Sequence, residues 1–128
     1  MTKSELKVLI CDDSILARKN LRSTLNECGI KNIFEVCDGQ SAIDTYKAER
    51  PDIVFLDIVM PVKDGITALK EICQFKPDAY VVMVSSVGTQ MHLRESVKSG
   101  AKDFLQKPPA IEQVEAVITR AVGGDSQG

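Results

Sequence analysis

The sequence has little material for a zinc site, a membrane span or a nucleic-acid surface. It has 4 cysteines without a Cys-x-x-Cys pair, and its only histidine, His92, is far from them, so no zinc site is expected. The longest apolar run, around residues 80–84, is strand-sized and too short to span a membrane. With 16 basic and 18 acidic residues, the net charge of −2 lacks the basic excess of a nucleic-acid-binding protein.

Signals for secretion and for disulfide formation are also missing. The N-terminal residues lead directly into an apolar strand, without the apolar core of a signal peptide, so a cytoplasmic protein is expected. Each cysteine falls in an apolar stretch, and all of them are expected to be buried, reduced core thiols: Cys11, Cys28, Cys37 and Cys73.

The length and composition are those of one globular domain. The chain has 128 residues, of which 44% are hydrophobic and 27% are charged, which leaves little room for a second domain. We expect the domain to span residues 1–122. Residues 123–128 have no apolar anchor and are expected to form a flexible tail.

Short apolar runs alternate with amphipathic helical stretches along the whole chain. The apolar runs are rich in β-branched residues and are residues 7–11, 33–37, 53–57, 80–85 and 103–105. The stretches after them repeat apolar residues at helical spacing, as Ala17, Leu21, Leu25 and Cys28 do in the first. This alternation predicts an α/β fold, with a parallel sheet, right-handed crossovers and helices on both faces.

Chemically useful side chains follow four of the predicted strands. Asp12 and Asp13 end the first strand, Asp57 the third, Ser85 the fourth and Lys107 the fifth, whereas the second ends in an ordinary turn. In an open parallel sheet, ligands bind at the carboxyl ends of the strands. These five side chains are therefore expected to meet at one edge of the sheet.

Three carboxylates at one edge would raise one another's pKa values unless a cation lay among them, and an all-oxygen ligand set suits Mg²⁺. Asp57 ends the middle contributing strand and is the best-placed nucleophile, which would give an acyl phosphate on attack at a phosphoryl group. Lys107 would balance the phosphoryl charge and Ser85 would donate a hydrogen bond to it. Each residue also has an ordinary alternative role; Asp13 and Ser14, for example, could simply cap the first helix.

These residues lie in segments that resemble the receiver domain of two-component response regulators, most closely the stand-alone, CheY-like kind. The segments are VLICDDS (8–14), PDIVFLDIVMPVKDG (51–65), VVMVSS (81–86) and GAKDFLQKP (100–108), within a resemblance that covers residues 6 to about 122. The resemblance implies a doubly wound, flavodoxin-like (βα)5 fold with a five-stranded parallel sheet in the order 2-1-3-4-5. It also implies a signalling switch that catalyses only its own phosphorylation and dephosphorylation.

The resemblance assigns the phosphoacceptor and the metal ligands. It implies that Asp57 accepts a phosphoryl group from a sensor histidine kinase or a phosphotransfer protein. It implies that Mg²⁺ is held by Asp12, Asp13 and Asp57, with the backbone carbonyl of Val59 as a further ligand.

The resemblance also assigns the switch. Ser85 would follow the phosphoryl group, Phe104 would turn inward with it, and Lys107 would pair with the phosphate ahead of a cis bond to Pro108. The surface of the fourth helix, fifth strand and fifth helix would then bind a downstream protein, possibly in chemotaxis. The implied protein is a monomer without nucleic-acid or membrane partners.

Two positions depart from the polar residues that many receivers use to tune hydrolysis. Val59 and Val87 lie two residues past the acceptor and two past the hydroxyl. Two valines would screen an acyl phosphate from water without orienting that water. We therefore expect slow self-dephosphorylation.

Other functions remain open from the sequence alone. The protein could be a phosphorelay intermediate, or the receiver of a larger regulator, for which Gly123 and Gly124 would suit a linker. A phosphatase with an aspartate nucleophile usually carries a second Asp where Val59 stands. A flavin-binding module needs backbone N–H groups where the acidic Asp12 and Asp13 stand. Both are therefore disfavoured.

Overall fold

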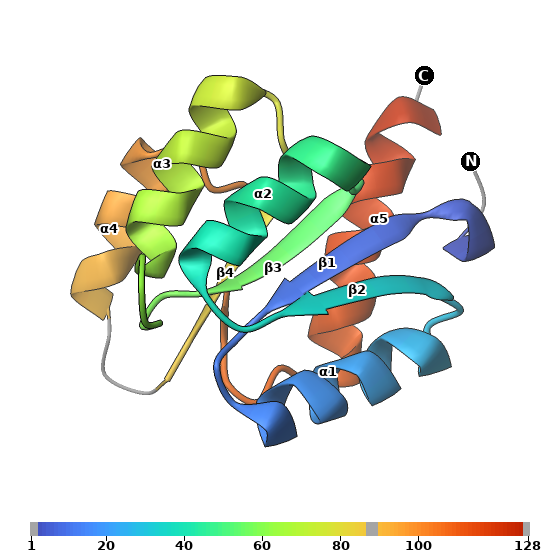
Figure 1. Cartoon of the computed structure of the whole chain (residues 1–128). Coiled ribbons are helices and arrows are strands. Elements are labelled where there is room, and N and C mark those ends of the chain that lie inside the picture. Colours follow the sequence, from blue (N-terminus) through green and yellow to red (C-terminus); the bar gives the residue numbers. More distant parts are fainter. Residues whose placement is uncertain (1–2, 87–89, 127–128) are drawn as a thin grey trace.

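Five parallel strands form the centre of the molecule. The computed structural model describes residues 3–86 and 90–126, and of residues 90, 91 and 123–126 it describes the backbone. The strands are β1 (Lys7–Cys11), β2 (Asn32–Val36), β3 (Ile53–Asp57), β4 (Val81–Ser85) and β5 (Asp103–Gln106). They lie in the order β2-β1-β3-β4-β5 (Figure 1), which confirms the predicted fold class and strand order.

Helices cover both faces of this sheet. A short 3₁₀ turn, Lys3–Glu5, precedes β1, and the α-helices are α1 (Ile15–Glu27), α2 (Gly39–Glu49), α3 (Gly65–Phe75), α4 (Gln90–Lys98) and α5 (Ile111–Ser126). In Figure 1, α1 and α5 lie on one face, and α2, α3 and α4 lie on the other. The described part of the chain contains no helix with the length and apolar character that a membrane crossing needs.

Each central strand sends alternate side chains into two hydrophobic cores. In β1, Val8 and Ile10 join the core under α1 and α5, whereas Leu9 and Cys11 join the core under α2 and α3. β3 and β4 are buried along their whole length, as expected for parallel strands covered on both faces. The absence of polar alternation in these runs is therefore a consequence of two-sided burial.

Several predicted boundaries differ from the observed ones. β2 starts and ends one residue earlier than expected, β4 starts at Val81, and β5 extends to Gln106. Helix α5 continues to Ser126, past the domain edge expected at residue 122. No proline interrupts residues 111–126, so the helical hydrogen bonds can continue through the two glycines. The flexibility of residues 123–128 remains a prediction.

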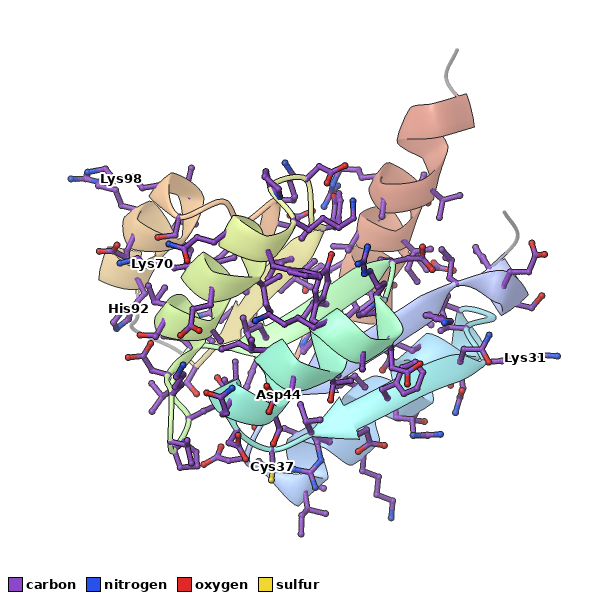
Figure 2. The ribbon with its side chains drawn as sticks, turned by 45° about the horizontal axis from the view of Figure 1, so that its top comes forward. Lys31, Cys37, Asp44, Lys70, His92 and Lys98 are labelled. Carbon is purple, nitrogen blue, oxygen red and sulfur yellow. The ribbon has the colours of Figure 1, made fainter. Side chains whose placement is uncertain are left out.

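The expected burial of all four cysteines is wrong for Cys37. Cys11 and Cys28 are buried and Cys73 is half-buried, but Cys37 is exposed, and all four are free thiols. Figure 2 shows Cys37 beyond the end of β2. β2 is an edge strand whose residues are at most half-buried, so an apolar stretch there does not imply a buried thiol.

Candidate functional site

Asp57 lies at the carboxyl end of the central strand β3 and is 7% exposed. The start of α3 packs directly behind it, where Gly65 donates a backbone hydrogen bond to Ile58 O at 2.7 Å. A Cβ atom on Gly65 would lie 1.9 Å from the backbone oxygen of Asp57. Glycine is thus the residue that allows α3 to begin this close to the end of the strand.

Asp12 follows β1, is 6% exposed, and has a partner for each of its carboxylate oxygens. Oδ1 accepts a hydrogen bond from the backbone N–H of Ser14 at 2.9 Å, and Oδ2 lies 2.6 Å from Nζ of Lys107. Ser14 in turn caps α1, because its Oγ accepts a bond from Ala17 N at 3.1 Å. Ser14 therefore has the capping role considered for this pair, and the exposed Asp13 lies at the cluster of acids.

The three acids converge closely enough to share a cation. One oxygen each of Asp12, Asp13 and Asp57 lies within 4.8 Å of the others. Burial, followed by the charge of Asp12, raises the pKa of Asp57 to about 6, against the opposing effect of Lys107. A hard divalent cation with oxygen ligands fits this donor set and would relieve the mutual repulsion.

Lys107 joins two of these acids from the other side of the site. Its Nζ lies 2.6 Å from Asp12 Oδ2 and 3.2 Å from Asp57 Oδ2. Burial alone would lower the pKa of Lys107, but its bond to Asp12 and the charges of Asp57 and Asp12 outweigh that effect and raise it. The Lys107–Pro108 peptide bond is cis, as expected, and Lys107 N donates to Ser85 O at 2.7 Å.

The structure describes three of the four remaining predicted residues, Ser85, Phe104 and Val59. Ser85 ends β4 and is 2% exposed. Phe104 pairs with Met83 in the sheet and packs, half-buried, against the core under α2 and α3. The side chain of Val59 is 68% exposed, and Val87 lies outside the described residues.

An open cavity of about 630 Å³ runs from the acids along α1. Asp12, Asp57 and Lys107 line one end of it, and its remaining lining includes Ile10, Phe55, Val84, Leu16, Leu21, Pro108 and Pro109. Asp57 is thus buried against the protein but reached from solvent through this cavity.

Sequence reasoning missed two features that position the site. Lys63 N donates to Pro61 O at 2.8 Å across Val62, whose φ is +68°, which makes a strained γ-turn in the loop that follows Asp57. Arg18, on the first turns of α1, donates to the backbone oxygen of Asp12 at 2.7 Å. Its position six residues after Asp12 is the available signal, because helical side chains point back toward the helix N-terminus.

Comparison with known proteins identifies the family of this chain. The chain is 40% identical to protein CcdB of Bacillus subtilis, with 91% of this chain and 98% of that protein covered. It is 37% identical to the chemotaxis protein CheY of the same organism, with 91% and 97% covered. The receiver domain of NtrX from Brucella abortus superposes with a TM-score of 0.85 at 29% identity, covering 91% of this chain and 98% of that chain. Residues 8–119 match the response regulator receiver domain family, and the chain therefore belongs to that family.

Proposed function

We propose that this protein is a cytoplasmic signalling switch that accepts a phosphoryl group on Asp57 from a sensor histidine kinase or a phosphotransfer protein. The observation that supports this most directly is the surroundings of Asp57. A buried carboxylate lies with two other acids on one side and Lys107 at 3.2 Å on the other. A turn acid without a catalytic role would need neither the other two acids nor the half-buried Lys107 beside it.

Asp12, Asp13 and Asp57, with the backbone carbonyl of Val59, would hold Mg²⁺. When bound, the ion supplies positive charge to the oxygens of the transferring group. Ionised Asp57 provides the oxygen that bonds to phosphorus, while the donor's bond to phosphorus breaks and its electron pair stays on the donor. Lys107 offsets the charge of the phosphoryl oxygens, and at about 4 Å and an effective dielectric of about 20 that attraction is about 4 kcal/mol before desolvation.

The output would arise on the β4–β5 side of the site. Ser85 would donate a hydrogen bond to the phosphoryl group, and Phe104 would turn inward as the backbone after Ser85 moves. The face of α4, β5 and α5 would then bind a downstream protein, with the receiver itself a monomer. The phosphoryl group must bind the active arrangement better than the inactive one, by about 5.5 kcal/mol for a shift from 1:99 to 99:1.

Incubation with Mg²⁺ and acetyl phosphate, followed by intact-mass measurement, tests the proposal. The wild type should gain the mass of one phosphoryl group, and Asp57→Asn should gain none. Asp44→Asn is the matched control, because Asp44 lies exposed on α2 (Figure 2) and should leave the adduct unchanged. The absence of an adduct in the wild type would overturn the proposed function.

The relatives named chemotaxis protein CheY support an output in chemotaxis. CcdB matches to a similar extent, and the alternative is a phosphorelay intermediate. Phosphorylated protein should retain its phosphoryl group beside a histidine phosphotransfer domain if it is a terminal switch. Rapid return of the group to a histidine would favour the relay.

Val59→Asn should shorten the lifetime of the phosphorylated state. Val59 is exposed beside the acceptor, where an amide could orient an attacking water that valine only excludes. We expect hydrolysis to become about tenfold faster, equivalent to about 1.4 kcal/mol of barrier. Loss of the phosphoryl mass over time measures the rate, with Val59→Leu as the apolar control. Equal lifetimes for the Asn variant and the wild type would contradict the expected screening.

A further inference from the structure

Asp12 is held at its backbone as well as at its carboxylate. Its N–H donates to Val36 O in the neighbouring strand at 3.2 Å. Its carbonyl oxygen precedes α1 and has no acceptor role in the helical ladder, yet it accepts a bond from Nη1 of Arg18 at 2.7 Å. Since Lys107 and Ser14 N contact the carboxylate, Arg18 is the side chain that fixes the carbonyl end of this residue.

Arg18 is itself fixed by an acid on the edge strand. Its Nε lies 3.2 Å from Oε1 of Glu35 on β2, and the Arg18 side chain is 17% exposed. Glu35 is the sheet partner of Ile10 in β1, two residues before Asp12. The guanidinium therefore joins β2 to the turn between β1 and α1, and its planar donors suit two acceptors held at fixed positions.

Arg22 provides a matched comparison one helical turn further along α1. Its Nη1 lies 2.7 Å from Oε2 of the same Glu35, and its side chain is 44% exposed. Among the described contacts, the bond to the Asp12 carbonyl belongs to Arg18. The two arginines thus share a charge and an acid partner but differ in contact with the site.

We infer that Arg18 is a positioning residue for the cation site, which orients Asp12 through its carbonyl and takes its own orientation from Glu35. This inference rests on the proposed function, because the oriented carboxylate is a Mg²⁺ ligand there. Groups that orient metal ligands typically contribute about 10- to 100-fold in metal affinity. If Arg18 acted only through its charge, its removal would have the opposite effect on cation affinity, since removing a nearby positive charge would strengthen cation binding.

Direct cation binding by Arg18→Met and Arg22→Met tests the inference. Mg²⁺ affinity is measured by titration calorimetry, and Mn²⁺ affinity by the electron paramagnetic resonance signal of free Mn²⁺. We expect about tenfold weaker binding for Arg18→Met and a change within about twofold for Arg22→Met. Arg18→Lys keeps the charge but offers a single donor centre for two acceptors, and should fall between Arg18→Met and the wild type.

Phosphorylation by acetyl phosphate across a Mg²⁺ series adds a second measurement. The half-saturating Mg²⁺ concentration should rise about tenfold in Arg18→Met, while the rate at saturating Mg²⁺ stays near that of the wild type. Unchanged or tighter cation binding by Arg18→Met, or equal losses in both arginine variants, would overturn the inference. A wild type that binds no cation and accepts no phosphoryl group would instead overturn the proposed function.

Discussion

Gly65→Ala should destabilise the protein by about 3 kcal/mol and slow phosphorylation of Asp57 by about 100-fold or more. The added Cβ would lie 1.9 Å from Asp57 O, 2.8 Å from Asp57 C and 2.8 Å from Ile58 Cα. All three are backbone atoms, so no side chain can rotate to make room. Either α3 or the end of β3 must move, and a displacement of about 1 Å at a reacting group costs about 100-fold in rate.

Urea unfolding measures the stability, and the rate of adduct formation with acetyl phosphate measures the function. Gly29→Ala is the control, because Gly29 has φ +92° and its Cβ would meet only the Lys3 side chain at 3.6 Å. That variant should lose about 1 kcal/mol through backbone strain and keep the wild-type rate. A Gly65→Ala protein with wild-type stability and rate would show that the contact behind Asp57 can relax.

Asp57→Asn should stabilise the protein at pH 7.5 by about 2 kcal/mol in the absence of divalent cations. Burial and the charge of Asp12 raise the pKa of Asp57 from 3.8 to about 6, and roughly two pKa units correspond to about 3 kcal/mol. The asparagine gives up a charge partner for Lys107, which keeps Asp12 at 2.6 Å. That loss reduces the net gain.

The stability of Asp57→Asn relative to the wild type should increase with pH. The folded protein binds a proton at Asp57 more tightly than the unfolded chain does. The protonated Asp57 side chain therefore contributes to the stability of the fold below pH 3.8, and this contribution is lost as the pH rises through about 6. The advantage of Asp57→Asn should therefore be small at pH 4 and reach its full size above pH 6. Thermal unfolding of both proteins at pH 4, 5, 6 and 7.5 measures it.

Mg²⁺ should reduce the stability difference between Asp57→Asn and the wild type at pH 7.5. Binding to the ionised carboxylates stabilises the wild type by mass action, whereas Asp57→Asn has lost one ligand charge. The prediction would be contradicted if Asp57→Asn were no more stable than the wild type at pH 7.5, or if its gain in stability were the same at every pH. Either result would mean that the ionised Asp57 does not destabilise the fold.

The α/β fold class and the meeting of the central residues at one edge of the sheet followed from local sequence patterns, whereas the strand order followed from the family resemblance. Strand ends are marked by the change from apolar to polar residues, and parallel topology brings Asp12, Asp57 and Lys107 to one edge without further information. The exposure of Cys37 did not follow, because its burial was inferred from the apolar character of its own stretch and not from the edge position that the implied strand order gives β2. Local composition carries little information about which strand is the outermost.

Contacts made to backbone atoms were also beyond the sequence patterns. The role of Gly65 depends on the distance between the start of a helix and the strand before it. The bond from Arg18 to the Asp12 carbonyl depends on the pitch of α1 and on the position of Glu35 in another strand. Both contacts depend on distances between segments that the tertiary fold brings together. The residue types show which residues could make such contacts, but not which contacts form.

The close backbone contacts at Gly39 and Gly65 leave the loop after Asp57 less free to move than the rest of the site. A Cβ on Gly39 would lie 2.1 Å from Lys63 O, just as one on Gly65 would meet Asp57 O. The loop from Asp57 to Gly65 is thus wedged between the starts of α2 and α3, main chain against main chain. Backbone atoms in such contacts cannot change rotamer, so this loop has little freedom to rearrange when a new charge appears at Asp57. If the proposed function holds, the segment around Asp57 would be a fixed support, and the side chains left to convert phosphorylation into a change of shape would be those of β4 and β5, Ser85 and Phe104 among them.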